Sequence, residues 1–128
     1  MKKIHWVILA VIFGLAYFLR VMFLPQNILT FGYDQARDAA VSQQILNGDV
    51  KIQGPPASTP GLYHGVFYYY LLSIPYSLGQ NPIYAAYFVA LLNAATVFIV
   101  FNLGYLMTKK AWVGILAAFL FAISFEAT

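Results

Sequence analysis

IYAAYFVALLNAATVFIVFNLGYLM, residues 83–107, is the stretch that decides the fold. It contains no Asp, Glu, Lys, Arg or His. A run of about 20 apolar residues is enough for a helix to cross the roughly 30 Å hydrocarbon core of a bilayer. The segment therefore predicts a membrane-spanning helix.

Two further apolar runs lie on either side of this segment, at residues 4–24 and 111–126. Hydrophobic residues make up 62% of the 128-residue chain and charged residues 9%, whereas a typical soluble domain has about 25% charged residues. We expect an all-α polytopic membrane protein with three transmembrane helices. A cleavable signal peptide is the alternative for the first run, but its apolar part is long and no small-x-small site precedes Pro25, which favours a retained helix.

The basic residues predict the orientation of these spans. Lys2, Lys3, Lys109 and Lys110 lie at the ends of apolar runs, where the positive-inside rule places cytoplasmic flanks. The amino terminus and the turn at 108–110 are therefore expected in the cytoplasm, and residues 25–82 outside, in an integral protein of the plasma (inner) membrane. The net charge of +3 forms no basic patch, so we expect no nucleic-acid partner.

The outer segment, residues 25–82, is expected to fold into two short helices at the membrane surface. Apolar residues recur near helical spacing over 34–47, with Asp34 as a candidate N-cap and Gly48 as the residue that ends the helix. A Pro- and Gly-rich loop follows, with a brief extended piece at 50–53. Residues 65–78 form an aromatic segment, interrupted by Pro75, which suits an interfacial or re-entrant helix.

Three charged residues stand close together in the first of these helices. Asp34 and Asp38 are four residues apart, so their carboxylates share one helical face with Arg37. A carboxylate at a partly dry interface can act as a general base or bind a divalent ion. The alternative is structural: Asp34 caps the helix, and Arg37 and Asp38 form its solvated polar face.

The other polar candidates also have two readings each. His64 is either a hydrogen-bonded structural group or a ligand-binding residue. The tyrosines at 68, 69, 70 and 76 are typical of a belt at the lipid headgroups, and a sugar-binding platform is the alternative. Arg20, near the outer end of the first span, either extends to the headgroups or binds an anionic lipid phosphate.

The layout and two local motifs resemble the amino-terminal part of the GT-C glycosyltransferases, especially family 39. That family includes the protein O-mannosyltransferases and the lipid A aminoarabinose transferases. Its members carry an acidic pair in the first outer loop, often as D-E-x-R-Y-A, where this chain reads Asp34-Gln35-Ala36-Arg37-Asp38-Ala39. Many also have a motif of the form H/K-P-P-L-x-Y-W, where this chain has His64-Gly65-Val66-Phe67-Tyr68-Tyr69-Tyr70-Leu71.

The resemblance implies a function and a set of site residues. It implies sugar transfer from a polyprenyl-phosphate donor to a hydroxyl of a protein, lipid or glycan acceptor on the outer face of the membrane, with Asp34 as the catalytic base. The expected substrate-binding residues are Arg37, Asp38, His64 and Tyr69. Gln35 replaces the second acid of the family, and Asp38 stands one helical turn further on. Asp34 and Asp38 are the candidate ligands for a divalent cation, Mg²⁺ or Mn²⁺.

The resemblance also implies that residues 1–128 form part of a larger transmembrane domain and are inactive in isolation. A different class of function stays open beside it, namely a non-catalytic small membrane protein, an accessory subunit or a transporter fragment. Transporter sites place polar groups near the bilayer midplane. The apolar runs here are nearly free of ionisable residues, which weighs against transport.

Overall fold

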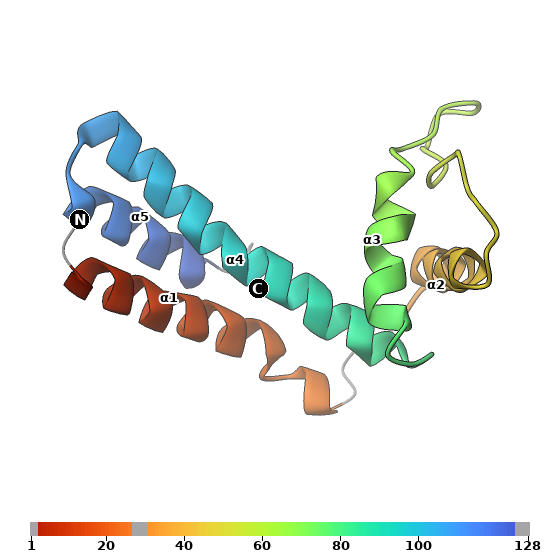
Figure 1. Ribbon diagram of the computed structural model, residues 1–128, viewed down its shortest axis with the longest axis horizontal. Coiled ribbons are helices and arrows are strands. Elements are labelled where there is room, and N and C mark those ends of the chain that lie inside the picture. The colour runs from red at the N-terminus through yellow and green to blue at the C-terminus, as the bar shows by residue number, and fades with distance from the viewer. Residues whose placement is uncertain (1–2, 27–30, 125–128) are drawn as a thin grey trace. The chain divides into compact units, whose positions relative to one another are not determined.

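The computed structural model of the protein describes residues 3–26 and 31–124 (Figure 1). Its elements are α1 (Lys3–Val21), the 3-10 turn η1 (Leu24–Gln26), α2 (Tyr33–Leu46), α3 (Phe67–Tyr76), α4 (Pro82–Thr108) and α5 (Ala111–Ala122). No strand forms within these described residues, where one isolated antiparallel bridge joins Pro56 and Tyr63. The prediction of an all-α chain is therefore confirmed.

The helices divide into two compact units. Unit 1 comprises residues 1–28 and 87–128, and unit 2 comprises residues 29–86. The boundary between them falls within α4, so this helix begins in unit 2 and continues into unit 1.

Two of the helices are long and apolar enough to cross a membrane. α1 has 19 residues and α4 has 27, which at 1.5 Å per residue gives lengths of about 28 Å and 40 Å. α5 has only 12 residues, about 18 Å, which is less than the roughly 30 Å hydrocarbon core. Within residues 3–26 and 31–124, the structure thus has two candidate spans, and the three expected spans are not shown. The end of the predicted third span, residues 125–126, lies outside the described residues.

The helices of unit 1 pack through small residues. Gly104 of α4 lies against the backbone of Gly114 of α5, and a Cβ added at Gly114 would come within 2.6 Å of the Phe101 carbonyl oxygen. Close approach of this kind is typical of helix contacts in membranes, where van der Waals packing replaces the hydrophobic effect. The core is formed by Leu9, Ile12, Ala16, Ala94, Val97, Phe101, Ala118 and Ala122.

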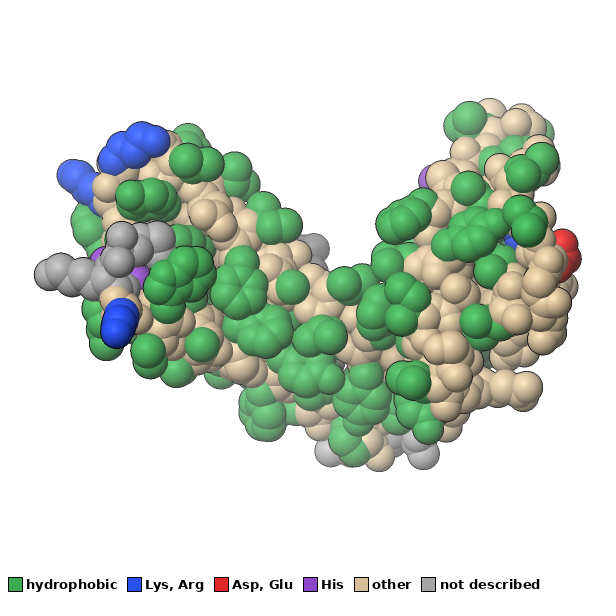
Figure 2. Space-filling view, viewed as in Figure 1, with side chains coloured by type: hydrophobic (Ala, Val, Ile, Leu, Met, Phe, Trp, Pro, Cys, Tyr) green, Lys and Arg blue, Asp and Glu red, His purple; other side chains and the backbone are tan. Residues whose placement is uncertain are grey.

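The outer surface of unit 1 is mainly apolar. Figure 2 shows hydrophobic side chains over its visible face and basic side chains at the end where α1 begins and α4 joins α5. Lys3, Lys109 and Lys110 are all exposed. This distribution is the one expected of a membrane-spanning unit with a positively charged flank.

A proline stands at one end of each candidate span. The predicted first span reached residue 24, but α1 ends at Val21. Pro25 has no N–H to donate to the carbonyl four residues earlier, that of Val21, and its ring would clash with that carbonyl, and the chain forms a 3-10 turn at Leu24–Gln26 instead. α4 begins with Pro82, and the side-chain oxygen of Asn81 accepts a 3.0 Å hydrogen bond from the Ile83 N–H. Proline at the first position and Asn at the N-cap are favourable helix starts.

In unit 2, α2 covers the predicted segment 34–47, but its N-terminus differs from the prediction. The N-cap is Gly32, not Asp34. The Gly32 N–H donates to the Gln35 side-chain oxygen at 3.0 Å, which is one half of a capping box. Asp34 is therefore not needed as a cap, and it stands in the first turn, where the helix dipole favours a carboxylate.

The C-terminus of α2 confirms the role predicted for Gly48. This residue has a positive φ of 93°, its N–H donates to the Ile45 carbonyl oxygen, and the Asp49 N–H donates to that of Gln44. These two bonds define a Schellman motif. The loop that follows forms no strand at residues 50–53.

α3 is shorter than the predicted 65–78, at Phe67–Tyr76, and Pro75 lies inside it. Proline removes one helical N–H donor. Pro75 is the next-to-last residue of α3, and helical bonding continues past it, since the Ser77 N–H donates to the Ser73 carbonyl oxygen at 2.9 Å.

The close contact between α4 and α5 predicts that Gly114→Ala destabilises unit 1 by about 1–3 kcal/mol, because the new methyl group would overlap the Phe101 carbonyl and ring. Gly14→Ala is the matched control, since a Cβ at that helical position meets nothing within 4 Å. It should be neutral or stabilising by up to ~1 kcal/mol. Denaturant unfolding in detergent, followed by circular dichroism, measures both. Equal stability of the two variants would show that the α4–α5 contact is not close.

Candidate functional site

The candidate site is built on the packing of α2 against α3 in unit 2. Ser42 of α2 is fully buried, and its hydroxyl donates to the Asp38 carbonyl oxygen at 2.7 Å and contacts the Tyr69 carbonyl oxygen at 3.3 Å. Ala39 packs with Leu72 and Tyr76 in the same interface. Small residues at 39 and 42 allow the two helices to approach closely, which fixes the position of the neighbouring Asp38.

Arg37 binds both acidic residues of α2. Its Nε and Nη2 donate to Asp38 Oδ1 at 3.0 and 2.7 Å, and its Nη1 donates to Asp34 Oδ1 at 2.9 Å. The side chain of Asp38 is 10% exposed, that of Arg37 22% and that of Asp34 73%. The three residues thus form a chain of ion pairs that leads from the buried carboxylate to the exposed one.

The loop between α2 and α3 is held by specific contacts. The Tyr70 hydroxyl accepts a hydrogen bond from the Lys51 N–H at 3.1 Å and donates to the Lys51 carbonyl oxygen at 2.9 Å. Gly54 is buried, and a Cβ there would collide with the backbone of His64 and Gly65. The His64 N–H donates to the Pro55 carbonyl oxygen at 2.8 Å. These contacts bring the two ends of the loop together beside α2.

The loop and the two helices line an open cleft of about 530 Å³. This volume is within the range of small-molecule sites, roughly 300–1,000 Å³. The cleft is lined by Asp34, Arg37, Asp38, Pro55, Pro56, Ser58, His64, Gly65 and Tyr68. Four of the five residues expected in the site from the sequence therefore line one cleft.

The fifth expected residue, Tyr69, lies elsewhere. It is 3% exposed, packs in the α2–α3 interface and lines a separate recess with residues of the loop. Tyr68 occupies the cleft in its place. The spacing of Tyr69, Leu72 and Tyr76 is a sequence signal for one helical face, and all three side chains are buried. That signal groups Tyr69 with Leu72 and Tyr76, and the structure shows that this face of α3, not that of Tyr68, is the buried one.

Electrostatics keep Arg37 charged and Tyr68 neutral at pH 7. The hydrogen bond to Asp38 raises the pKa of Arg37 above its usual value. Burial raises the pKa of Tyr68, and the nearby Asp38 carboxylate raises it further. The cleft thus combines a permanent cation, an exposed carboxylate, a phenol O–H and an imidazole. This set can accept a proton at Asp34 and bind hydroxyl or phosphate oxygens through the donors around it.

Metal ligands do not gather in the described part of the chain. Within residues 3–26 and 31–124, no three His, Asp or Glu side chains lie close enough together to hold one ion. Asp34 and Asp38, the two candidates from the sequence, each direct a carboxylate oxygen to Arg37.

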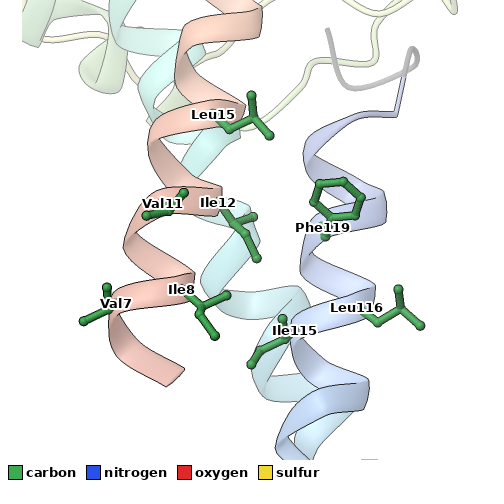
Figure 3. A pocket seen from close by; sticks show the side chains of 8 residues that line it. All are labelled: Val7, Ile8, Val11, Ile12, Leu15, Ile115, Leu116 and Phe119. Carbon is green, nitrogen blue, oxygen red and sulfur yellow. The ribbon is translucent and has the colours of Figure 1, made fainter. Parts of the chain in front are cut away.

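A second hollow lies in unit 1 and has a different character. It is a groove of about 470 Å³ between α1 and α5 (Figure 3). Its lining side chains are Val7, Ile8, Val11, Ile12, Leu15, Ile115, Leu116 and Phe119. None of these carries a polar group, so the groove offers no acid, base or hydrogen-bond donor for catalysis.

Arg20 also lies in unit 1, where it links α1 to α5. Its Nη1 donates to the Ala16 and Ala122 carbonyl oxygens at 2.7 and 3.4 Å, and its guanidinium carbon is 5.4 Å from the centre of the Phe121 ring. The side chain therefore caps the end of α5, where a cation is favourable.

No protein-family model, curated protein or solved structure matches this chain.

The packing of Gly54 predicts that Gly54→Ala opens the loop. The added methyl group would displace the backbone of residues 64–65, and the amide of His64 should then exchange with solvent faster. Gly65→Ala is the control, because a Cβ at that position meets nothing within 4 Å. Hydrogen exchange read by mass spectrometry compares the two variants, and equal protection of residues 55–64 in both would contradict the close approach at Gly54.

Proposed function

We propose that this protein is part of a GT-C type membrane glycosyltransferase, which transfers a sugar from a polyprenyl-phosphate donor to an acceptor hydroxyl on the outer face of the membrane. The observation that carries the proposal is the cleft in which Asp34 and Arg37 of α2 meet His64, a residue 30 positions away from Asp34 in the sequence. The two motifs that carry the resemblance to family 39 thus contribute to one cavity.

The exposure of the acids supports the choice of Asp34 as the base. Asp34 is largely exposed, and one of its oxygens is bound by Arg37, so the second can face an acceptor hydroxyl. Asp38 is nearly buried and receives two N–H groups from Arg37. A proton acceptor must reach its substrate within hydrogen-bonding distance, and Asp34 meets this condition better than Asp38.

The proposed reaction is a direct displacement at the anomeric carbon. Asp34 takes the proton of the acceptor hydroxyl, and the acceptor oxygen forms a bond to the anomeric carbon from the face opposite the phosphate. The bond between that carbon and the phosphate oxygen breaks, and polyprenyl phosphate leaves with the electron pair. The configuration of the sugar is inverted. His64 is proposed to contact the donor phosphate, and Arg37 to keep Asp34 oriented toward the acceptor.

The proposed location follows from the distribution of charge. α1 and α4 would cross the plasma (inner) membrane, with the lysines of unit 1 on the cytoplasmic side. Unit 2 would then lie outside, at the level where the phosphate of a polyprenyl lipid meets water. A donor of this kind is presented at the headgroup level, so a cleft formed by short helices on the outer face of the membrane would suit it.

The first test is Asp34→Asn in the full-length protein, reconstituted in proteoliposomes with a radiolabelled polyprenyl-phosphate sugar. Asn retains an oxygen that can accept the hydrogen bond from Arg37 but cannot take up the acceptor proton. We therefore expect a loss of about 10²–10⁴-fold in kcat, the usual contribution of a general base, with unchanged expression and thermal stability.

Asp49→Asn is the matched control for this test. Asp49 is also an exposed acid of unit 2 in an ion pair, with Lys51, but it lies outside the cleft. Its substitution should leave transfer intact. Full activity of Asp34→Asn would overturn the base assignment and favour a non-catalytic membrane subunit.

The orientation is tested with single cysteines, which the natural chain lacks. A cysteine at Ser58, an exposed loop residue of unit 2, should react with an impermeant maleimide in intact cells. A cysteine at Lys109, in the turn between α4 and α5, should react only after permeabilisation. The reverse labelling pattern would place unit 2 in the cytoplasm and remove it from the side on which the proposed transfer occurs.

A further inference from the structure

The contacts of Arg37 bear on the divalent cation that the sequence led us to expect. A cation shared by Asp34 and Asp38 would need carboxylate oxygens from both residues. Asp38 Oδ1 already accepts hydrogen bonds from Nε and Nη2 of Arg37, and Asp34 Oδ1 accepts one from Nη1. The guanidinium therefore occupies the space between the carboxylates, and the residues present do not fit a metal ion in that position.

The nearly buried carboxylate of Asp38 holds the Arg37 side chain in place. Asp38 is fixed by the α2–α3 interface, where Ser42 bonds to its backbone, and its side chain is 10% exposed. A nearly buried carboxylate that loses its cation is strongly destabilised. Exchange of Arg37 for a hydrated metal ion would have to offset this loss, together with the loss of three charge-assisted hydrogen bonds, two to Asp38 and one to Asp34.

We propose that Arg37 serves as the built-in cation of this cleft: it occupies a latent divalent-metal site between Asp34 and Asp38, and it orients Asp34 in the way that a metal ion would. Asp38 is then a positioning residue that acts through Arg37, rather than a residue that touches the substrate. One consequence of the inference rests on the proposed function: sugar transfer should need no added Mg²⁺ or Mn²⁺.

The latent site between Asp34 and Asp38 can be tested by a gain of metal binding. Asp34 and Asp38 are on adjacent turns of one helix face, and His64 lines the same cleft. When Arg37 is replaced by Gln, the two carboxylates lose their cation but keep their places on α2. They then form a pair of carboxylates one helical turn apart, and carboxylate oxygens are ligands that suit Mn²⁺.

The experiment titrates the full-length protein in lipid nanodiscs with Mn²⁺ and follows free Mn²⁺ by electron paramagnetic resonance. The wild type should bind Mn²⁺ no better than its Asp34→Asn variant. Arg37→Gln should bind it roughly tenfold or more tightly than the wild type, because a unit positive charge next to both carboxylates has been removed. Adding Asp38→Asn to Arg37→Gln should abolish the gain.

Lys51→Gln is the matched control, since it removes a cation paired with a single carboxylate, that of Asp49, outside the cleft. It should produce no gain of Mn²⁺ binding. The inference is overturned if the wild type binds Mn²⁺ in a manner that Asp34→Asn removes, or if Arg37→Gln gains nothing. The first of these outcomes is measured on the wild type and Asp34→Asn alone. It can therefore overturn the inference even if Arg37→Gln fails to fold.

Transfer activity separates this inference from the proposed function. We expect wild-type transfer to be unchanged by EDTA. Transfer that is lost in EDTA and restored by Mg²⁺ or Mn²⁺ would overturn the built-in cation and leave the transferase function standing. A complete absence of transfer from every polyprenyl-phosphate sugar would overturn the function, and the Mn²⁺ titration would still decide the role of Arg37.

Discussion

The close approach of α2 to α3 is the contact on which the rest of unit 2 depends. Ala39 and Ser42 present little side-chain volume, so α3 can pack directly on that face of α2, and the Ser42 hydroxyl reaches the Tyr69 backbone. Asp38 lies beside these residues and becomes buried as a result. Larger side chains at 39 or 42 would separate the helices and expose Asp38, and the ion-pair chain would lose its fixed end.

The burial of Asp38 explains why Arg37 is paired with it. An isolated buried carboxylate is costly, and its cost is offset only by a well-placed cation with good hydrogen-bond geometry. Arg37 supplies this cation and still reaches Asp34 at the surface. Unit 1 is different: its core consists of small and apolar side chains, and α4 and α5 approach each other closely at Gly104 and Gly114.

Most of the fold could be predicted from the sequence, since it follows from local rules. The apolar run at 83–107 became α4, and the surface segment at 34–47 became α2, because a helix satisfies its backbone hydrogen bonds within one segment. The errors occurred at helix ends. Gly32 rather than Asp34 caps α2, and α1 ends at Val21, because a cap or a proline shifts a boundary by a few residues without any change in the hydropathy pattern.

The candidate site was only partly predictable. The sequence by itself determined the triad of Asp34, Arg37 and Asp38, because helical spacing alone brings residues three and four apart together. The tertiary structure decided that Pro55, Pro56, Ser58 and His64 join them, since the loop is closed by the fit of Gly54 against residues 64–65 and by the Tyr70 hydroxyl. It also decided that Tyr68 rather than Tyr69 lines the cleft. Adjacent residues on a helix point about 100° apart, so only the packing of α3 against α2 could determine which of the two would be buried.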